Sequence, residues 1–467
     1  MRNLVTALLL FCGFAAAADN GAIAIRNAKI VTVSGAVIAK GTVVVRSGLI
    51  QDVGPNVAIP VDAVVIDGEG LTVYPGLVDA LSTWGMPGTG AATTGGRGGR
   101  GAAATAAPAA AATPAAPPAR GPEDRPLTTS WIKAADEIQP SDKRIEAARS
   151  AGFTTAAVWP TRGFFAGQGS LVDLLSDEKA GEMVLIPSLG QYISLTRAGG
   201  APVQGGAFPS ALMGAIAYVR QIYLDADHYQ LVKDAYAKNP RGMQRPEYDR
   251  ALEGVIESKR ILLPANRWVE VDRMIHFAAE LKQPAIYYGL REGFEDRSVK
   301  YLKDAHATVL VSLKWPEQPR DEDPEAEEPY RQLVIREKAP TTPAVLQKNG
   351  IKFALYSDGI DTPRDLQRAI KKAIDNGLSR EDALRALTLS PAEIYGVQDR
   401  LGSIEKGKIA NLTVTKGEIF DDRTKIEFVL VDGNKYVPAP EPAPAGRGGG
   451  ATAPSGPNGV KKSGVNQ

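Results

Sequence analysis

Short hydrophobic runs alternate with helical patterns along the middle of the chain, and this feature constrains the fold more than any other. Runs of this kind, continuously apolar, are typical of parallel strands that are covered on both faces. They occupy residues 154–159, 184–188, 261–264, 285–288, 308–313 and 352–356. Helical patterns lie between several of them, at residues 142–150, 268–281, 363–375 and 380–388. Repeated strand–helix units of this kind predict an α/β fold built on a (β/α)8 barrel, TIM-like in design.

Both ends of the chain instead carry the alternating pattern of short antiparallel strands, punctuated by glycines. These strands are predicted at residues 23–26, 28–33, 41–46, 49–53, 411–415 and 426–433. Two separate β domains of this size would each struggle to bury a core. We therefore predict one small β-sandwich assembled from residues 21–72 and 400–437, beside a barrel domain over residues 73–399.

Two stretches lack the large apolar residues needed to offset chain entropy, and both are predicted to be disordered. They are the Gly/Ala/Pro-rich insert 85–126, expected over the barrel mouth, and the tail 438–467. The insert's Arg97, Arg100 and Arg120 suggest either weak RNA or anion binding or simple solubilising charge. The net charge of +1 favours the second interpretation and argues against a nucleic-acid partner. The acidic, Pro-rich stretch 316–330 is expected to be a solvated loop.

The first 18 residues have the pattern of an export signal. Arg2 is followed by a short apolar run at residues 4–11, and cleavage is expected near Ala17 or Ala18. That run is too short to cross a bilayer, and no later segment is long and apolar enough to span one. The single cysteine, Cys12, lies within this signal, and bulky Phe11 disfavours lipid attachment there. We predict a periplasmic or extracellular protein without a thiol.

Three motifs lie near the ends of the predicted barrel domain: YPGLVDA at residues 74–80, ALRALTLSPAE at residues 383–393 and LGSIEKGKIANL at residues 401–412. In this order and at these separations, they resemble motifs of the amidohydrolase superfamily, and in particular of its imidazolonepropionase-like subgroup. The resemblance implies a (β/α)8 barrel beside a small β-sandwich. It also implies one or two divalent metals, often zinc, that activate water to hydrolyse amide-type bonds. The ligands would be an H-x-H after the first barrel strand, a histidine each from strands five and six, and an aspartate from strand eight.

The sequence departs from this ligand set at every histidine position. Leu81-Ser82-Thr83 stands where the H-x-H is expected, and the fifth and sixth strands end near Pro264-Ala265-Asn266 and Tyr287-Tyr288-Gly289. Only the strand-eight aspartate remains, as Asp358. It is the candidate site residue, either as a vestigial metal ligand or general base, or as a cap for the following turn. No bound cofactor is expected, and zinc in particular is doubtful for this chain.

The remaining candidate groups are weaker. His228, His276 and His306 are the three histidines of the chain, and each is predicted to be a surface or packed helix residue. Asp225 and Asp227 offer oxygens for a hard cation, but two residues separated by one do not share a helix face. Asp79 is either a carboxylate at the barrel mouth or a polar group bonded to backbone, and we favour the second interpretation. The glycines of Gly167-Gln168-Gly169 are placed in a strand–helix loop, where they either form a tight turn or bind an anion.

Three functions follow from these patterns. The first is a catalytically degenerate amidohydrolase homologue that binds a small-molecule ligand or supports an active relative. The second is an active hydrolase of amide or related non-peptide C–N bonds with a divergent metal site. The third is a structural partner, in a homo-oligomer or in a hetero-oligomer with an intact paralogue.

Overall fold

The computed structural model describes residues 21–87, 125, 127–176, 179–195, 211–318, 327–421 and 424–438. The predicted export signal with Cys12, nearly all of the insert and nearly all of the tail lie outside these residues. Among the helices that are described, none is long and apolar enough to cross a membrane.

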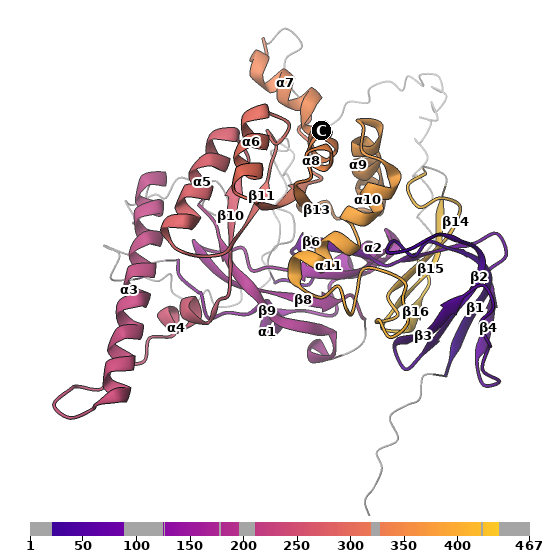
Figure 1. Cartoon of the computed structure of the whole chain (residues 1–467), viewed down its shortest axis with the longest axis horizontal. Coiled ribbons are helices and arrows are strands. Elements are labelled where there is room, and N and C mark those ends of the chain that lie inside the picture. Colours follow the sequence, from indigo (N-terminus) through magenta and orange to yellow (C-terminus); the bar gives the residue numbers. More distant parts are fainter. Residues whose placement is uncertain are drawn as a thin grey trace, which may run out of the picture.

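An eight-stranded sheet forms a nearly closed barrel in the middle of the molecule (Figure 1). Its strands follow one another in chain order: β6 (Leu77–Ser82), β7 (Phe153–Val158), β8 (Phe165–Asp173), β9 (Val184–Ile193), β10 (Ile261–Ala265), β11 (Ala285–Gly289), β12 (Thr308–Ser312) and β13 (Lys352–Tyr356). Asp79 on β6 bonds to Ser357 just after β13, so the first and last strands meet at a polar seam. The predicted barrel is thereby confirmed.

Helices pack around this barrel and connect most of its strands. They are α1 (Ala134–Glu137), α2 (Lys143–Ser150), α3 (Leu212–Lys238), α4 (Arg250–Glu257), α5 (Trp268–Glu280), α6 (Asp296–Asp304), α7 (Tyr330–Lys338), α8 (Thr342–Lys348), α9 (Pro363–Asp375), α10 (Arg380–Ala386) and α11 (Leu389–Tyr395), with 3-10 turns η2 (Ala180–Met183) and η3 (Ala339–Thr341).

Strand β8 departs from a regular strand–helix repeat, because it runs antiparallel to both β7 and β9. Only residues 159–164 separate β7 from β8. A parallel crossover needs a dozen or more residues, so a connection of this length forces the chain to turn straight back. The remaining neighbours in the barrel sheet pair in parallel.

Side chains of the barrel strands alternate between two cores. On β13, Phe353 and Leu355 pack into the core beneath the helices, whereas Ala354 and Tyr356 join a second core that includes Leu262, Ile286 and Leu310. This period of two is that of a strand covered on both faces. Positions 354 and 356 therefore face the barrel interior, and Asp358 continues that line beyond the strand end.

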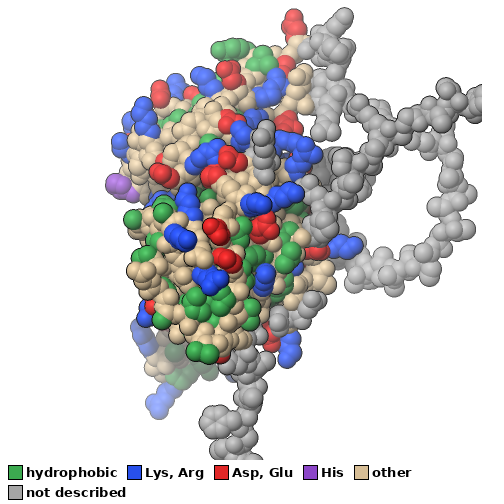
Figure 2. Space-filling model, turned by 90° about the vertical axis from the view of Figure 1, so that its right-hand side faces the viewer, with side chains coloured by type: hydrophobic (Ala, Val, Ile, Leu, Met, Phe, Trp, Pro, Cys, Tyr) green, Lys and Arg blue, Asp and Glu red, His purple; other side chains and the backbone are tan. Residues whose placement is uncertain are grey.

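A second eight-stranded sheet draws on both chain ends (Figure 1). Its strands are β1 (Ile23–Ile30), β2 (Ile38–Arg46), β3 (Leu49–Gly54), β4 (Val64–Asp67), β5 (Thr72–Pro75), β14 (Leu412–Lys416), β15 (Lys425–Val431) and β16 (Asn434–Tyr436). The two ends join where β5 pairs with β14. The sheet is not purely antiparallel, because β1 pairs in parallel with β4 and β5. Figure 2 looks onto the side of the molecule that carries this sheet, where basic and acidic side chains are interspersed.

One predicted loop boundary is wrong. The insert was expected to begin at Gly85, yet the Gly85 N–H donates to Asp142 and Met86 is buried, 3% exposed. Met86 is the one large apolar side chain in that stretch, so it packs into the core instead of remaining in solvent. The stretch 316–330 agrees with its prediction as a solvated loop over most of its described residues, because residues 317, 318, 327, 329 and 330 are exposed; Pro316 is half-buried and Tyr330 already begins α7.

Candidate functional site

The carboxyl ends of the parallel barrel strands form the mouth at which barrels of this type place their active sites. Counting from β6, β10 is the fifth strand and β11 the sixth, so Pro264-Ala265-Asn266 and Tyr287-Tyr288-Gly289 do lie at the ends of those strands. Leu81 and Ser82 end the first strand and are buried. None of these positions carries an imidazole.

Asp358 follows β13 and is half-buried at this mouth. Its backbone has a left-handed φ of 50°, which aspartate tolerates better than most residues. The carboxylate accepts a hydrogen bond of 2.6 Å from the hydroxyl of Ser312, at the end of neighbouring β12. In the turn that follows, Ile360 N–H donates to the Ser357 carbonyl, and no described backbone N–H donates to the Asp358 carboxylate.

Three tyrosines of the barrel strands lie close enough to Asp358 for its charge to raise their pKa values. Tyr192 comes from β9, Tyr288 from β11 and Tyr356 from β13, and the rings of Tyr192 and Tyr288 stack at 5.2 Å. Burial raises the pKa of Tyr192 to about 12, and burial, with the Asp358 charge adding to it, raises the pKa of Tyr356 well above its usual range. The phenols therefore stay neutral near pH 7. Sequence reasoning missed this cluster, although its inward strand positions follow from the period of two.

The donor set does not fit zinc. Zinc prefers thiolates and imidazoles, with carboxylates as partners. One carboxylate among neutral hydroxyl groups offers neither the charge nor the nitrogen ligands of such a site. Among the described residues, no three His, Cys, Asp or Glu side chains come together in a group that could hold a metal.

The second carboxylate near the mouth, Asp79, is fully buried and bonded as expected to backbone. Its Oδ1 accepts from the Ser357 N–H at 3.0 Å, and its Oδ2 accepts from the Ser357 hydroxyl at 2.5 Å. Burial raises the pKa of Asp79 to about 7, against the lowering effect of these hydrogen bonds. Asp79 thus holds the seam of the barrel and does not face the mouth as a free base.

A cleft of about 550 Å³ opens over the ends of β10 to β12, beneath α7. It is lined by Asn266, Arg267, Glu270, Arg291, Glu292, Pro316, Glu317, Glu328, Arg331, Gln332, Ile335 and Arg336. Its volume lies in the range of small-molecule sites. No sequence pattern indicates this cleft, because its walls come from four segments that only the fold brings together.

Ion pairs fix four of the eight charged side chains that line this cleft. Buried Glu292 pairs with Arg331 of α7 at 2.5 Å, and Glu328 pairs with Arg336. Arg291 stands between two residues that bond to the end of β10: Leu290 N–H donates to the Ala265 carbonyl and Glu292 N–H to the Asn266 carbonyl. The exposed Arg291 side chain has no ion-pair partner among the residues described. Its backbone is held in place while its guanidinium remains available to a ligand.

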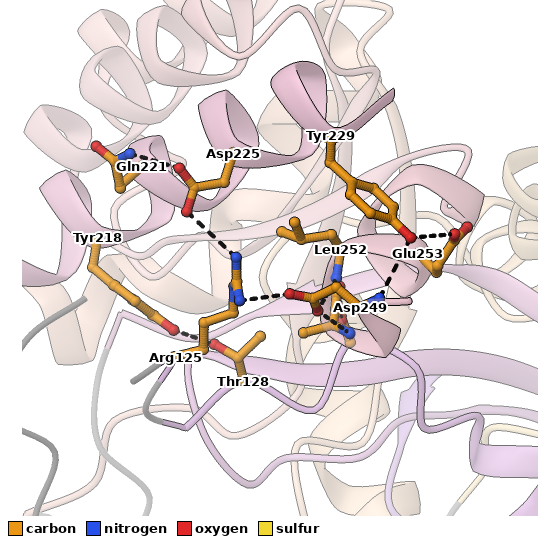
Figure 3. Close-up of polar contacts among 11 residues, drawn as sticks. Arg125, Thr128, Tyr218, Gln221, Asp225, Tyr229, Asp249, Leu252 and Glu253 are labelled. Carbon is orange, nitrogen blue, oxygen red and sulfur yellow. Dashed lines mark hydrogen bonds and ion pairs between the residues drawn. The ribbon is translucent and has the colours of Figure 1, made fainter. Parts of the chain in front are cut away.

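The three histidines all lie on the surface, as predicted. His228 is on α3, His276 is on α5, where its Nδ1 lies 2.9 Å from the Asp272 carbonyl, and His306 follows α6. The discounted cation site beside His228 also fails. Figure 3 shows Asp225 directed at Arg125, with which it pairs at 3.7 Å, and bonded to Gln221. Asp227 is exposed and does not join the contacts that Asp225 makes with Arg125 and Gln221.

The predicted glycine loop is wrong, because Gly167-Gln168-Gly169 lies within strand β8. These glycines serve close packing. A Cβ on Gly169 would lie 2.3 Å from the Trp159 ring, and one on Gly167 would lie 2.6 Å from the Ile132 carbonyl oxygen. Neither an anion loop nor a tight turn is present here.

Comparisons with known proteins agree with this architecture. The Amidohydrolase family model matches residues 272–437. An amidohydrolase of Thermotoga maritima MSB8 has a similar structure, with a TM-score of 0.70 and 26% identity over 89% of this chain and 100% of that one. A molinate hydrolase shares the fold alone, with a TM-score of 0.52 and 15% identity over 90% of this chain and 95% of its own.

One curated relative is similar over a short stretch. It is the N-acetylglucosamine-6-phosphate deacetylase of Haemophilus influenzae, 46% identical over 50 residues, which are 10% of this chain and 13% of that protein. The match is too short to transfer an activity. The C-terminal third of the chain thus carries the amidohydrolase family pattern, and the described structure as a whole has the barrel fold of amidohydrolases.

Proposed function

We propose that this chain is an exported, catalytically degenerate amidohydrolase homologue that binds a small-molecule ligand or supports an active relative. One observation carries the proposal: the strand ends where the family is expected to place metal ligands hold Leu81, Ser82, Asn266 and Gly289. Asp358, the one carboxylate kept at a family ligand position, lies near tyrosines and no imidazole. The cleft beside the mouth gives a ligand a place to bind without any metal.

Metal content and activity together test this proposal. Purified full-length protein should hold well under one equivalent of zinc or another divalent metal, measured by plasma mass spectrometry. It should release no product from a panel of N-acyl and amide substrates, with or without added zinc. One tightly bound metal ion per chain, together with amide hydrolysis that Asp358→Asn abolishes, would overturn the proposal.

An active hydrolase of amide or related C–N bonds with a divergent site is the second candidate. Its support is the pair formed by Asp358 and Ser312 at the mouth, since a carboxylate within hydrogen-bond reach of a hydroxyl can accept its proton. Under this alternative, metal-free protein hydrolyses a substrate of the panel, and Asp358→Asn and Ser312→Ala each lower kcat, by about 100-fold or more. Equal rates in the variants and the parent chain exclude it.

A further inference from the structure

A second cleft, of about 540 Å³, lies on α3 and α4, remote from the Asp358 mouth. It is lined by Tyr229, Lys233, Tyr236, Arg245, Pro246, Tyr248 and Glu253, and we call it the tyrosine cleft. Tyr229, Lys233 and Tyr236 are spaced by four and three residues, so they share one face of α3. The opposite wall is the segment from Arg245 to Tyr248, which leads into α4.

The floor of the tyrosine cleft is held by a compact polar network (Figure 3). The Tyr229 hydroxyl donates to Glu253 at 2.9 Å and accepts from the Asp249 N–H at 3.4 Å, and Lys233 pairs with Glu253 at 2.5 Å. The other side of the cleft, formed by Arg245 and Tyr248, is not held by such a network. Tyr248 is 79% exposed, and Arg245 is exposed and has no ion-pair partner among the described residues. The exposed ring of Tyr248, the half-buried ring of Tyr236 and the unpaired cation of Arg245 form a surface suited to an extended peptide.

Arg125 places one end of a proline-rich segment beside this cleft. Its Nη1 pairs with Asp249 at 2.5 Å, and Asp249 is the residue whose N–H reaches Tyr229. The twelve residues before Arg125, TPAAPPARGPED at 113–124, contain four prolines and end in two acidic residues. Aromatic-lined grooves bind proline-rich segments because a polyproline II helix loses little entropy on docking.

We propose that residues 113–124 of this chain dock in the tyrosine cleft, with prolines on the rings of Tyr236 and Tyr248 and an acidic side chain on Arg245. The span allows it. Tyr229 and Tyr236 are about 10 Å apart along the helix axis at about 1.5 Å per residue. Twelve residues in polyproline II conformation reach roughly 37 Å.

Covalent attachment makes even a weak contact effective. A short tether gives an effective concentration of about 1 mM, so an intrinsic affinity of ~0.1 mM leaves about one tenth of the molecules open. This docking is independent of the function proposed for the barrel mouth, since it uses none of the residues there.

Trypsin provides a test with an internal control. Arg97, Arg100 and Arg120 are each followed by glycine, and only Arg120 lies in the docked segment. In the full chain, cleavage after Arg120 should be about 10-fold slower than after Arg97 or Arg100, because proteolysis follows the open fraction. Each rate is first divided by the rate for a synthetic peptide of the same local sequence.

Surface variants then assign the protection to the cleft. The double variant Tyr236→Ala/Tyr248→Ala should raise the Arg120 rate to that of Arg97 and Arg100 and leave those two unchanged. Tyr330→Ala removes an exposed tyrosine of α7 and should change nothing, and Tyr236→Phe should keep the protection. Equal rates at all three arginines in the parent chain overturn the proposal. So does protection that survives the double variant, or protection that grows with protein concentration and therefore comes from a second copy.

Discussion

Asp79 is the residue on which closure of the barrel depends most directly. It links β6 to Ser357 after β13, and it does so without exposure to water. A carboxyl group in such a place is stabilised in its protonated form, because burial penalises the charge. Its pKa of about 7 therefore has a consequence for stability, since the unfolded chain ionises this group near 3.8.

Asp79→Asn should flatten the pH dependence of stability. Between about pH 4 and pH 7 the folded chain keeps a proton that the unfolded chain has released, so the free energy of unfolding falls as pH rises. Three pH units correspond to a loss of about 4 kcal/mol at most. Asp173 is equally buried, with its pKa raised by burial to about 7, and it remains in the variant. The variant should thus lose about half of the slope.

Urea unfolding at pH 5, 6, 7 and 8 measures this slope. Asp227→Asn removes an exposed carboxyl group of α3 and serves as the control, with a curve parallel to that of the parent chain. If Asp79→Asn gave that same parallel curve, Asp79 would already be ionised in the folded state.

Strand β8 packs closely in the barrel because Gly167 and Gly169 carry no side chains. Gly169→Ala would put a methyl group against the Trp159 ring, which is itself fully buried. Overpacking of this kind costs about 1–3 kcal/mol. The matched control is Gly181→Ala in η2, where nothing lies within 4 Å of the added Cβ and the change should stay within about 0.5 kcal/mol.

Chemical denaturation followed by tryptophan fluorescence compares the two glycine variants. A lower midpoint for Gly169→Ala than for Gly181→Ala is expected. Should both variants match the parent chain, the Trp159 ring must have room to move, and β8 is less tightly packed than its contacts indicate.

The contrast between α9 and β8 shows how far local sequence signals reach. Helix α9 occupies the predicted residues 363–375, because Pro363 opens it and the Thr362 side chain caps it through the Asp365 N–H. These signals lie within the element. Strand β8 escaped prediction because its glycines weaken the strand pattern, and the reason for them is a tryptophan ring from another segment.

The residues of the candidate site also differ in whether local sequence patterns could locate them. Asp358 and the ends of the fifth and sixth strands could be located from the hydrophobic runs that directly precede them in the sequence. Arg291 could not, because its availability depends on backbone bonds from Leu290 and Glu292 to β10 and on the pairing of Glu292 with α7. Contacts of this kind appear only once the chain has folded.

At the scale of the molecule, Asn411 joins the barrel to the sheet formed by the chain ends. Its Nδ2 donates to Thr155 of β7 at 2.9 Å and to Asp173 of β8 at 2.6 Å, and its Oδ1 accepts from the Asp432 N–H after β15. All of these groups are buried or partly buried. A polar network shared by two sheets should make them unfold together.

Asn411→Ala should lower the free energy of unfolding by about 2–4 kcal/mol, because it leaves buried polar groups on both sides without a partner.

Two spectroscopic signals measure this coupling. None of the five tryptophans of the chain belongs to the second sheet; they are Trp84, Trp131, Trp159, Trp268 and Trp315. Tryptophan fluorescence therefore reports on the barrel alone, whereas circular dichroism reports on both parts. The two midpoints should fall together in Asn411→Ala and stay unchanged in Asn239→Ala, which alters an exposed asparagine. The opposite result is a fluorescence midpoint that stays at the parent value while the dichroism midpoint falls. That result would mean that the barrel remains folded without the second sheet and that Asn411 does not couple the two.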